Sequence, residues 1–342
     1  MKPHQFLETV CLCLANKFTL MGVGPPGCGK TDISMQGIRK MNADVILMHP
    51  VVDDPTDYKG FPFKFVDPDT GLEAADFLAY GNLRKMVDAD KLTGVIMDDM
   101  GQAAKTVQAA AMQLVWGGTI NGKKISDKVS FIMLSNRRQD KAAVTSILEP
   151  LKNRSTIVHL ETDVDDWCRW GIKTKQPPEN IAFNRFRPRF LLEGFKATSD
   201  FLNSATPRSI ARCGEFLKAG IPKEIEFEIF EGTAGKEFAS EFMSFLRLYR
   251  ELPDINSIIR NPEECEVPTK DSVLYAVCEA IATRANRKNF DNIIKFSKRI
   301  SEEFMMMMIR DSIAHNKNVQ ETESFIQWQI DHQDVLLFTG NE

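Results

Sequence analysis

Long hydrophobic runs are missing from this sequence of 342 residues. The strongest candidate, at residues 304–309, is short and has charged residues on both sides, whereas a membrane-spanning helix needs about 20 apolar residues. We therefore expect no membrane partner. The apolar patch near the N-terminus is interrupted by Glu8 and has neither a basic leader nor a small-residue cleavage site. This pattern argues against a signal peptide and predicts a cytoplasmic protein.

The sequence also lacks metal-binding motifs and an excess of basic over acidic residues. The seven cysteines form no CxxC unit and the five histidines are isolated in the sequence, so no transition-metal site is indicated. Reduced cysteines are the simplest interpretation for a cytosolic protein. The 43 Lys and Arg residues face 47 Asp and Glu, for a net charge of −4. That balance leaves nucleic acid as a partner that is allowed but not favoured.

Strands and helices alternate in the first half of the chain. Strong helical spacing is found at residues 4–16, 31–40 and 105–116, and apolar runs typical of buried strands are found at residues 18–23, 44–48 with 51–52, 93–97 and 129–134. Such alternation predicts a parallel sheet covered by helices on both faces. Residues 53–80 contain many prolines and glycines and are expected to be rich in loops.

The second half of the chain has a different character. From about residue 165, strand signals vanish and long amphipathic helices dominate, for example at residues 238–249 and 289–311. The sequence therefore predicts an α/β core at residues 1–163. Helical regions are predicted at residues 164–248 and 249–342.

The strongest motif is GPPGCGKT at residues 24–31, which matches the phosphate-binding pattern GxxxxGK[ST]. It follows a predicted strand and precedes a predicted helix. Glycines let the backbone wrap around phosphate oxygens, which the N–H groups at the helix N-terminus attract. Lys30 would neutralise the β- and γ-phosphates, and the Thr31 hydroxyl would bind Mg²⁺. The predicted nucleotide-binding residues are Gly24, Pro25, Pro26, Gly27, Cys28, Gly29, Lys30, Thr31 and Asp32.

Acidic and amide side chains follow two of the other predicted strands. Asp98 would hold the hydration shell of Mg²⁺, and Asp99 would orient and polarise the attacking water, as in a Walker B element. A pair of aspartates also suits a helix cap or a solvated turn, but its place after a P-loop favours the Walker B interpretation. Asn136 would help to place the same water, although a role in a turn fits it as well.

The order of these parts resembles that of the MoxR-like AAA+ ATPases. The P-loop, the two aspartates and the strand ending in Asn136 are followed by LEPLKNR at residues 148–154 and ATPR at residues 205–208. DPTDYKGFP at residues 54–62 looks like the family's segment before Walker B, where an insertion interrupts the second helix. The resemblance covers nearly the whole chain and is strongest between residues 18 and 215.

The resemblance implies a role for each matching residue. Asn136 matches sensor 1, Arg154 the arginine finger and Arg208 sensor 2, which together with Asp99 make up the predicted catalytic set. A finger acts on the nucleotide of a neighbouring subunit and is worth about 10³–10⁵ in rate. The head-to-tail contact that this requires can close into a ring. An ordinary surface arginine at position 154 and a lid-helix salt bridge at Arg208 remain alternatives.

Family membership would also imply fold, cofactors and partners. The expected fold is a P-loop AAA+ parallel-sheet core flanked by helices, followed by an all-helical lid and a helical C-terminal region. The family uses ATP with Mg²⁺, usually forms hexamers and is often paired with a von Willebrand factor A domain protein. The family includes phage and bacterial members. The expected location is therefore the cytoplasm, or the host cytoplasm if the protein is phage-encoded. Most AAA+ enzymes carry Glu where this chain has Asp99, so hydrolysis could be slow.

Three further groups of residues and one cysteine also bear on function. The arginines of NRFRPRF at residues 184–190 either pair with acids at a junction of lid and core, which we favour, or contact nucleic acid. Lys123 and Lys124, on a hairpin predicted at Asn121 and Gly122, either contact a client in the pore of a ring or are solvated. The methionines at residues 305–308 are expected in a helix core rather than in a partner groove. Cys28 is expected to be exposed, so that alkylation would inhibit nucleotide binding.

We interpret the chain as a ring-forming ATPase that couples hydrolysis of Mg-ATP to the remodelling or maturation of a partner protein. One alternative is a nucleic-acid motor or loader. The other is a slow-hydrolysing nucleotide switch in a larger assembly.

Overall fold

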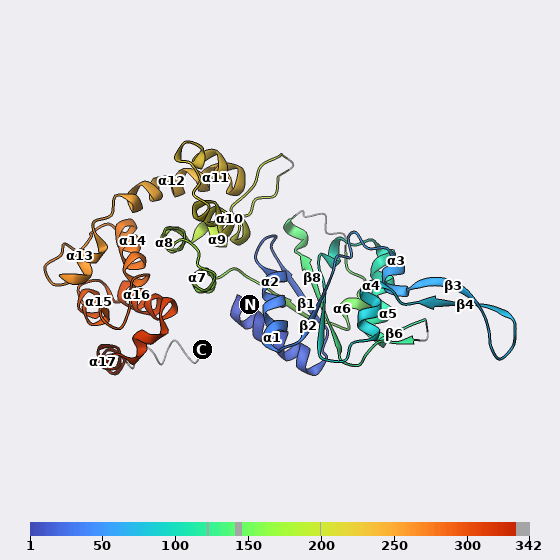
Figure 1. Cartoon of the computed structure of the whole chain (residues 1–342). Coiled ribbons are helices and arrows are strands. Elements are labelled where there is room, and N and C mark those ends of the chain that lie inside the picture. Colours follow the sequence, from blue (N-terminus) through green and yellow to red (C-terminus); the bar gives the residue numbers. More distant parts are fainter. Residues whose placement is uncertain (122, 141–145, 199, 333–342) are drawn as a thin grey trace. The chain divides into compact units, whose positions relative to one another are not determined.

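The computed structural model describes residues 1–121, 123–140, 146–198 and 200–332. The chain divides into two compact units, Met1–Thr162 and Asp163–Glu342. In Figure 1 the described strands all belong to the first unit, while the described part of the second unit is built from helices and loops.

The first unit alternates strands and helices. Its helices are α1 (Pro3–Asn16), α2 (Lys30–Lys40), α3 (Pro55–Lys59), α4 (Gly81–Val87), α5 (Lys105–Gly117) and α6 (Glu149–Lys152), with short 3₁₀ turns at Met100–Gln102 and Arg138–Asp140. Its strands are β1 (Leu20–Gly24), β2 (Asp44–Met48), β3 (Phe61–Val66), β4 (Glu73–Leu78), β5 (Thr93–Met97), β6 (Thr119–Ile120), β7 (Lys123–Lys124), β8 (Val129–Asn136) and β9 (Thr156–His159).

Five of the described strands form one parallel sheet in the order β2-β5-β8-β1-β9. Strand β8 therefore lies between β1 and β5, and Gly24 at the end of β1 pairs with Asn136 at the end of β8. The carboxyl ends of parallel strands meet at one edge of a sheet, which is where open α/β sheets bind ligands. This register brings the P-loop, the two aspartates and Asn136 to the same edge.

Side chains alternate between the two faces of the sheet, as the pleat requires. On β8, Ile132 and Leu134 pack against α1 and α2, while Phe131 and Met133 pack against α5. Both faces are covered, and β5 and nearly all of β8 are buried. The predicted α/β class is confirmed, and the central strands are apolar runs because neither face meets water.

Residues 53–80 are more structured than the sequence predicts. Asp54 is the N-cap of helix α3, and its side chain accepts from the Thr56 N–H at 2.9 Å. Pro55 is well suited to the first helical position. Strands β3 and β4 then form an antiparallel hairpin in which Phe61 pairs with Leu78. The expected loop is therefore wrong, because proline and glycine here start a helix and bound a hairpin.

The end of β2 and the segment before β8 bear on two smaller predictions. Residues 51 and 52 lie in a turn after β2 and do not extend that strand. The expected hairpin before β8 is confirmed by the pairing of β6 with β7, in which Thr119 faces Lys124. The predicted turn residue Gly122 and the side chain of Lys123 lie outside the described residues.

The described part of the second unit is all helical, as expected for this half of the chain. Its α-helices are α7 (Val164–Lys173), α8 (Pro178–Phe186), α9 (Arg189–Leu192), α10 (Pro207–Lys218), α11 (Glu226–Ala234), α12 (Lys236–Arg250), α13 (Ile255–Arg260), α14 (Asp271–Ala282), α15 (Phe290–Ser297), α16 (Glu302–His315) and α17 (Glu323–Asp331). Short 3₁₀ turns lie at Lys223–Ile225 and Lys317–Glu321. None of the helices in the described ranges is long and apolar enough to cross a membrane.

Two apolar clusters hold these helices together. One is centred on Phe183, whose ring lies 5.0 Å from that of Phe242 and 5.4 Å from that of Phe238. The other joins α13 to α17 and contains most of the predicted methionine run, with Met308 fully buried. The helix-core interpretation of these methionines is confirmed.

The helix predicted over residues 289–311 is instead two helices. The chain leaves α15 after Ser297, and Ser301 has the extended backbone of an N-cap residue. Glu302 and Glu303 occupy the first turn of α16, where negative charge favours a helix start. The apolar spacing continues across the break, which is why periodicity alone predicted a single helix.

The arginines of NRFRPRF pair with acids. Arg185 contacts Asp165 and Asp311, and Arg187 contacts Glu241 at 2.8 Å. Arg189 contacts Glu237 at 2.9 Å. The expected pairing is therefore present, but every one of these partners belongs to the second unit rather than to the α/β core.

Candidate nucleotide site

The P-loop joins β1 to α2 and wraps the end of the sheet. Gly27 and Gly29 have φ angles of 72° and 97°, in the left-handed region that residues with a side chain rarely adopt. Gly29 is the residue directly before α2, so the loop lies at the N-terminus of this helix. A helix N-terminus of this kind attracts phosphate.

Lys30 is held inside this loop, with 7% of its surface exposed. Its ammonium donates to the carbonyls of Gly24 at 3.1 Å and Pro25 at 3.0 Å, and to Asn136 Oδ1 at 2.8 Å. Burying a cation is costly unless strong acceptors surround it. A phosphate in the loop would supply anionic acceptors to an ammonium already positioned there.

Thr31 and Asp98 meet although they are far apart in the sequence. The Thr31 hydroxyl donates to Asp98 Oδ2 at 2.7 Å. Both residues are half-buried. A hydroxyl and a carboxylate are hard oxygen ligands of the type that Mg²⁺ takes beside substrate phosphates and water. The described residues contain no cluster of three or more His, Cys, Asp or Glu that could hold a metal ion.

Asp99 has a left-handed backbone, with φ of 54° and ψ of 33°. Its Oδ1 accepts from Asn136 Nδ2 at 3.0 Å. Asn136 thus bridges Lys30 and Asp99, and only one orientation of its amide satisfies both contacts. Non-glycine residues in this conformation store some strain and cluster at functional sites. The sheet edge therefore carries a chain of contacts from the P-loop lysine to the second aspartate.

The remaining predicted site residues are placed differently. Asp32 is exposed in the first turn of α2. Arg154 is exposed between α6 and β9, where its Nη1 donates to the Pro150 carbonyl at 3.0 Å. Arg208 is exposed on α10 in the second unit. The finger and sensor roles of these two arginines stay predictions.

Cys28 corrects one expectation. The sequence predicted an exposed thiol, but only 5% of its surface is exposed. Burial raises the pKa of the Cys28 thiol, and the nearby charge of Lys30 opposes this only in part. The side chain belongs to the apolar cluster that contains Leu160, so alkylation is not favoured at this position.

Two residues near Arg154 escaped the sequence analysis. The Arg154 guanidinium lies 4.6 Å from the centre of the Trp116 ring, and buried Gln108 bonds to the segment that leads into α6. Trp116 fell on a predicted helix and Gln108 looked like any polar helix residue. No local signal links either of them to residue 154.

Comparisons with known proteins add little to this geometry. No protein-family model matches the sequence, and no curated protein matches it. Among solved structures, the chain is similar to a point mutant of RuvB from Thermotoga maritima, with 13% identity over 81% of this chain and 80% of that chain and a TM-score of 0.42. It is also similar to NtrX from Brucella abortus, with 12% identity over 90% of this chain and 67% of that chain and a TM-score of 0.42. At such values the likenesses contribute nothing to the assignment of activity.

Proposed function

We propose that this chain is a Mg²⁺-dependent ATPase of the AAA+ type that works as a homo-oligomeric ring, hexameric in its family. The observation that carries the proposal is the convergence at one sheet edge. Lys30, Asn136 and Asp99 form one chain of contacts, and Thr31 meets Asp98 beside it. A glycine-rich turn without a ligand does not require this arrangement.

Each residue has a distinct part in the proposed reaction. The loop amides and Lys30 bind the phosphates, and Thr31 and Asp98 would hold Mg²⁺ directly or through its water shell. When bound, the ion neutralises charge on the phosphate oxygens. Asp99 orients the attacking water, and Asn136 fixes the Asp99 carboxylate through the 3.0 Å bond. Arg154 supplies positive charge to the site of a neighbouring copy, and Arg208 acts as sensor 2.

The biological role proposed here follows from the resemblance. The ATPase would remodel or mature a client protein, for which a protein with a von Willebrand factor A domain is the first candidate. A slow-hydrolysing nucleotide switch is the second candidate function. Asp99 favours it, because its side chain is one methylene shorter than the Glu of most AAA+ enzymes and is already bonded to Asn136.

Hydrolysis and binding measurements on three variants test the ATPase proposal. We expect Asp99→Asn to bind ATP like the native chain and to lose turnover, because the amide cannot polarise water. Lys30→Ala should lose both binding and turnover. Lys40→Ala, an exposed lysine on the same helix, is the matched control and should change neither. Native binding and turnover in Lys30→Ala would overturn the proposal, and unchanged turnover in Asp99→Asn would remove that residue from the reaction.

A further inference from the structure

Arg154 stands on a backbone that is fixed on both sides. It follows α6, which Leu151 anchors in the apolar cluster under α5. After it, the Ser155 N–H donates to the Lys152 carbonyl at 3.1 Å, and the Thr156 N–H donates to the Thr19 carbonyl at 2.9 Å. The second contact starts strand β9. The position of the Arg154 Cα is therefore set by the sheet.

The segment that enters α6 is fastened to α5 by Gln108. This side chain is fully buried. Its amide donates to the carbonyls of Ala103 at 3.1 Å and Ser146 at 3.0 Å, and its oxygen accepts from the Leu148 N–H at 3.0 Å. Helix α5 starts shortly after Asp99, so the same helix connects the second aspartate to the arginine segment.

Only the side chain of Arg154 is left to be ordered, and Trp116 contacts it. Trp116 lies near the C-terminal end of α5, with 67% of its surface exposed. The guanidinium stacks over its ring at 4.6 Å, and one edge donates to the Pro150 carbonyl. Cation–π contact with tryptophan is the strongest of its kind.

We infer that Trp116 is a positioning residue for Arg154, which it holds ready to reach the nucleotide of a neighbouring copy. This inference rests on the proposed function. A free arginine side chain samples many rotamers, and it loses this conformational freedom when the guanidinium binds a phosphate. The ring and the Pro150 carbonyl restrict those rotamers in advance while part of the guanidinium stays open to an anion. Preorganisation of this kind raises rate rather than affinity for the ground state.

A mixing experiment isolates this effect. Asp99→Asn copies cannot hydrolyse but carry an intact Arg154, whereas Arg154→Ala copies have an intact site of their own but no finger. Mixed before assembly, the two should restore turnover. We expect the donor Asp99→Asn/Trp116→Ala to restore about two- to fivefold less kcat, the order that loss of a cation–π contact at an exposed site allows, with KM unchanged from that seen with the intact donor.

Two further donors serve as controls. Asp99→Asn/Trp116→Phe keeps an aromatic face and should restore most of the turnover. Asp99→Asn/Phe18→Ala, which removes an equally unpacked aromatic with 57% of its surface exposed, should restore as much as Asp99→Asn alone. Light scattering and thermal unfolding of each donor show whether it assembles and folds like Asp99→Asn.

The outcomes separate the inference from the proposed function. If the native chain hydrolyses no ATP, the proposed function fails. If Arg154→Ala turns over normally by itself, the finger role fails and takes the Trp116 inference with it. If Arg154→Ala is inactive and the Trp116→Ala donor, assembled normally, rescues as well as Asp99→Asn, only the role of Trp116 is overturned.

Discussion

At the scale of single residues, the Thr31 hydroxyl donates to Asp98 Oδ2 at 2.7 Å. The two side chains come from α2 and from the end of β5, so their meeting depends on the packing of that helix against the sheet. Gly94 on β5 permits it, because a Cβ there would lie 2.6 Å from Ile38 Cδ1 of α2.

Thr31→Ala should therefore weaken nucleotide binding only when Mg²⁺ is present. We expect a loss of at least about tenfold in affinity, equivalent to about 1.4 kcal/mol, because one protein oxygen near the ion is removed. Thr31→Ser keeps the hydroxyl and should bind within about twofold of the native chain. Titration calorimetry with Mg²⁺ and with EDTA measures the difference. Equal weakening of Thr31→Ala in both conditions would show that the hydroxyl serves the fold and not the ion.

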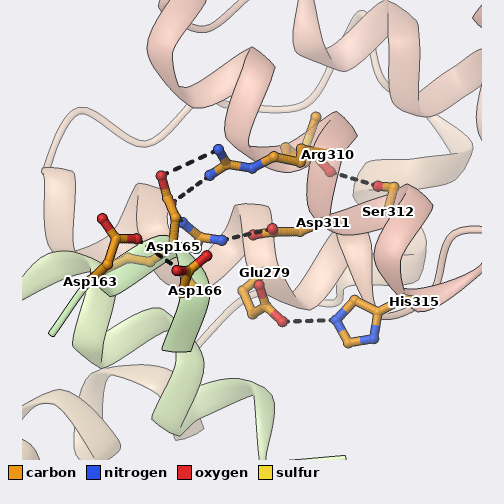
Figure 2. A network of polar contacts seen from close by, with 10 residues as sticks. Asp163, Asp165, Asp166, Glu279, Arg310, Asp311, Ser312 and His315 are labelled. Carbon is orange, nitrogen blue, oxygen red and sulfur yellow. Dashed lines mark hydrogen bonds and ion pairs between the residues drawn. The ribbon is translucent and has the colours of Figure 1, made fainter. Parts of the chain in front are cut away.

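At the scale of elements, α16 is joined to α7, α8 and α14 by a network of charged side chains, of which Arg185, Asp311 and Glu279 are buried. Arg185 donates to Asp165 Oδ1 at 2.8 Å and to Asp311 Oδ1 at 2.7 Å. Figure 2 shows Arg310 directed at Asp165 and His315 directed at Glu279, whose facing atoms are 2.9 Å apart. One oxygen of Asp311 and one of Glu279 are buried with no hydrogen-bond partner among the described residues. Buried charges of this kind are costly unless each positive group is paired with a negative one.

This network predicts a pH dependence of stability. Burial raises the pKa of Asp311 to about 7, although Arg185 favours the charged form. An acid whose pKa is raised by folding binds an extra proton in the folded state. Its stabilising contribution is complete below the unfolded pKa, near 3.8, and is lost as the pH rises towards 7.

Asp311→Asn should remove this dependence. We expect the free energy of unfolding of the variant, relative to the native chain, to rise between pH 5 and 7 by up to about 1.4 kcal/mol per pH unit and to level off above pH 7. Urea unfolding across pH 5–8 measures it. Glu224→Gln, an exposed acid in the same unit, should leave the profile unchanged. Parallel profiles for Asp311→Asn and the native chain would mean that Asp311 is already charged at pH 5.

At the scale of the whole molecule, the two units have separate apolar cores, and the P-loop belongs to the first. A ligand that binds only the folded protein stabilises it in proportion to the logarithm of its excess over Kd. Mg-ATP at 100 times its Kd should therefore raise the free energy of unfolding by about 2.7 kcal/mol. Denaturant unfolding of the Asp99→Asn variant, which avoids hydrolysis, measures this directly. No stabilisation by any nucleotide would mean that the P-loop does not bind one, and Lys30→Ala should behave in that way.

Much of the fold and the placement of most candidate site residues could be predicted from the sequence. The P-loop is a local signal, since strand, glycines, lysine and helix start occupy one continuous segment. Asp98, Asp99 and Asn136 could be predicted because each follows a buried apolar strand, and parallel strands end at one edge. The hairpin β3–β4 is not predicted: Phe61, Phe63 and Phe65 alternate along its first strand, but the prolines and glycines around it favour a loop. Nor is the break between α15 and α16, where the apolar spacing runs on.

What the sequence determined by itself is therefore the turn between β1 and α2 that carries the P-loop motif, the acids and amide that end at the same sheet edge, and the division into an α/β part and a helical part. All of these depend on neighbours in the chain or on the two periods of secondary structure. Only the tertiary structure decided that Cys28 is buried, that Arg185 lies between two acids from different helices, and that Trp116 lies under Arg154. Those contacts join residues far apart in sequence, so they exist only once packing has brought the elements together.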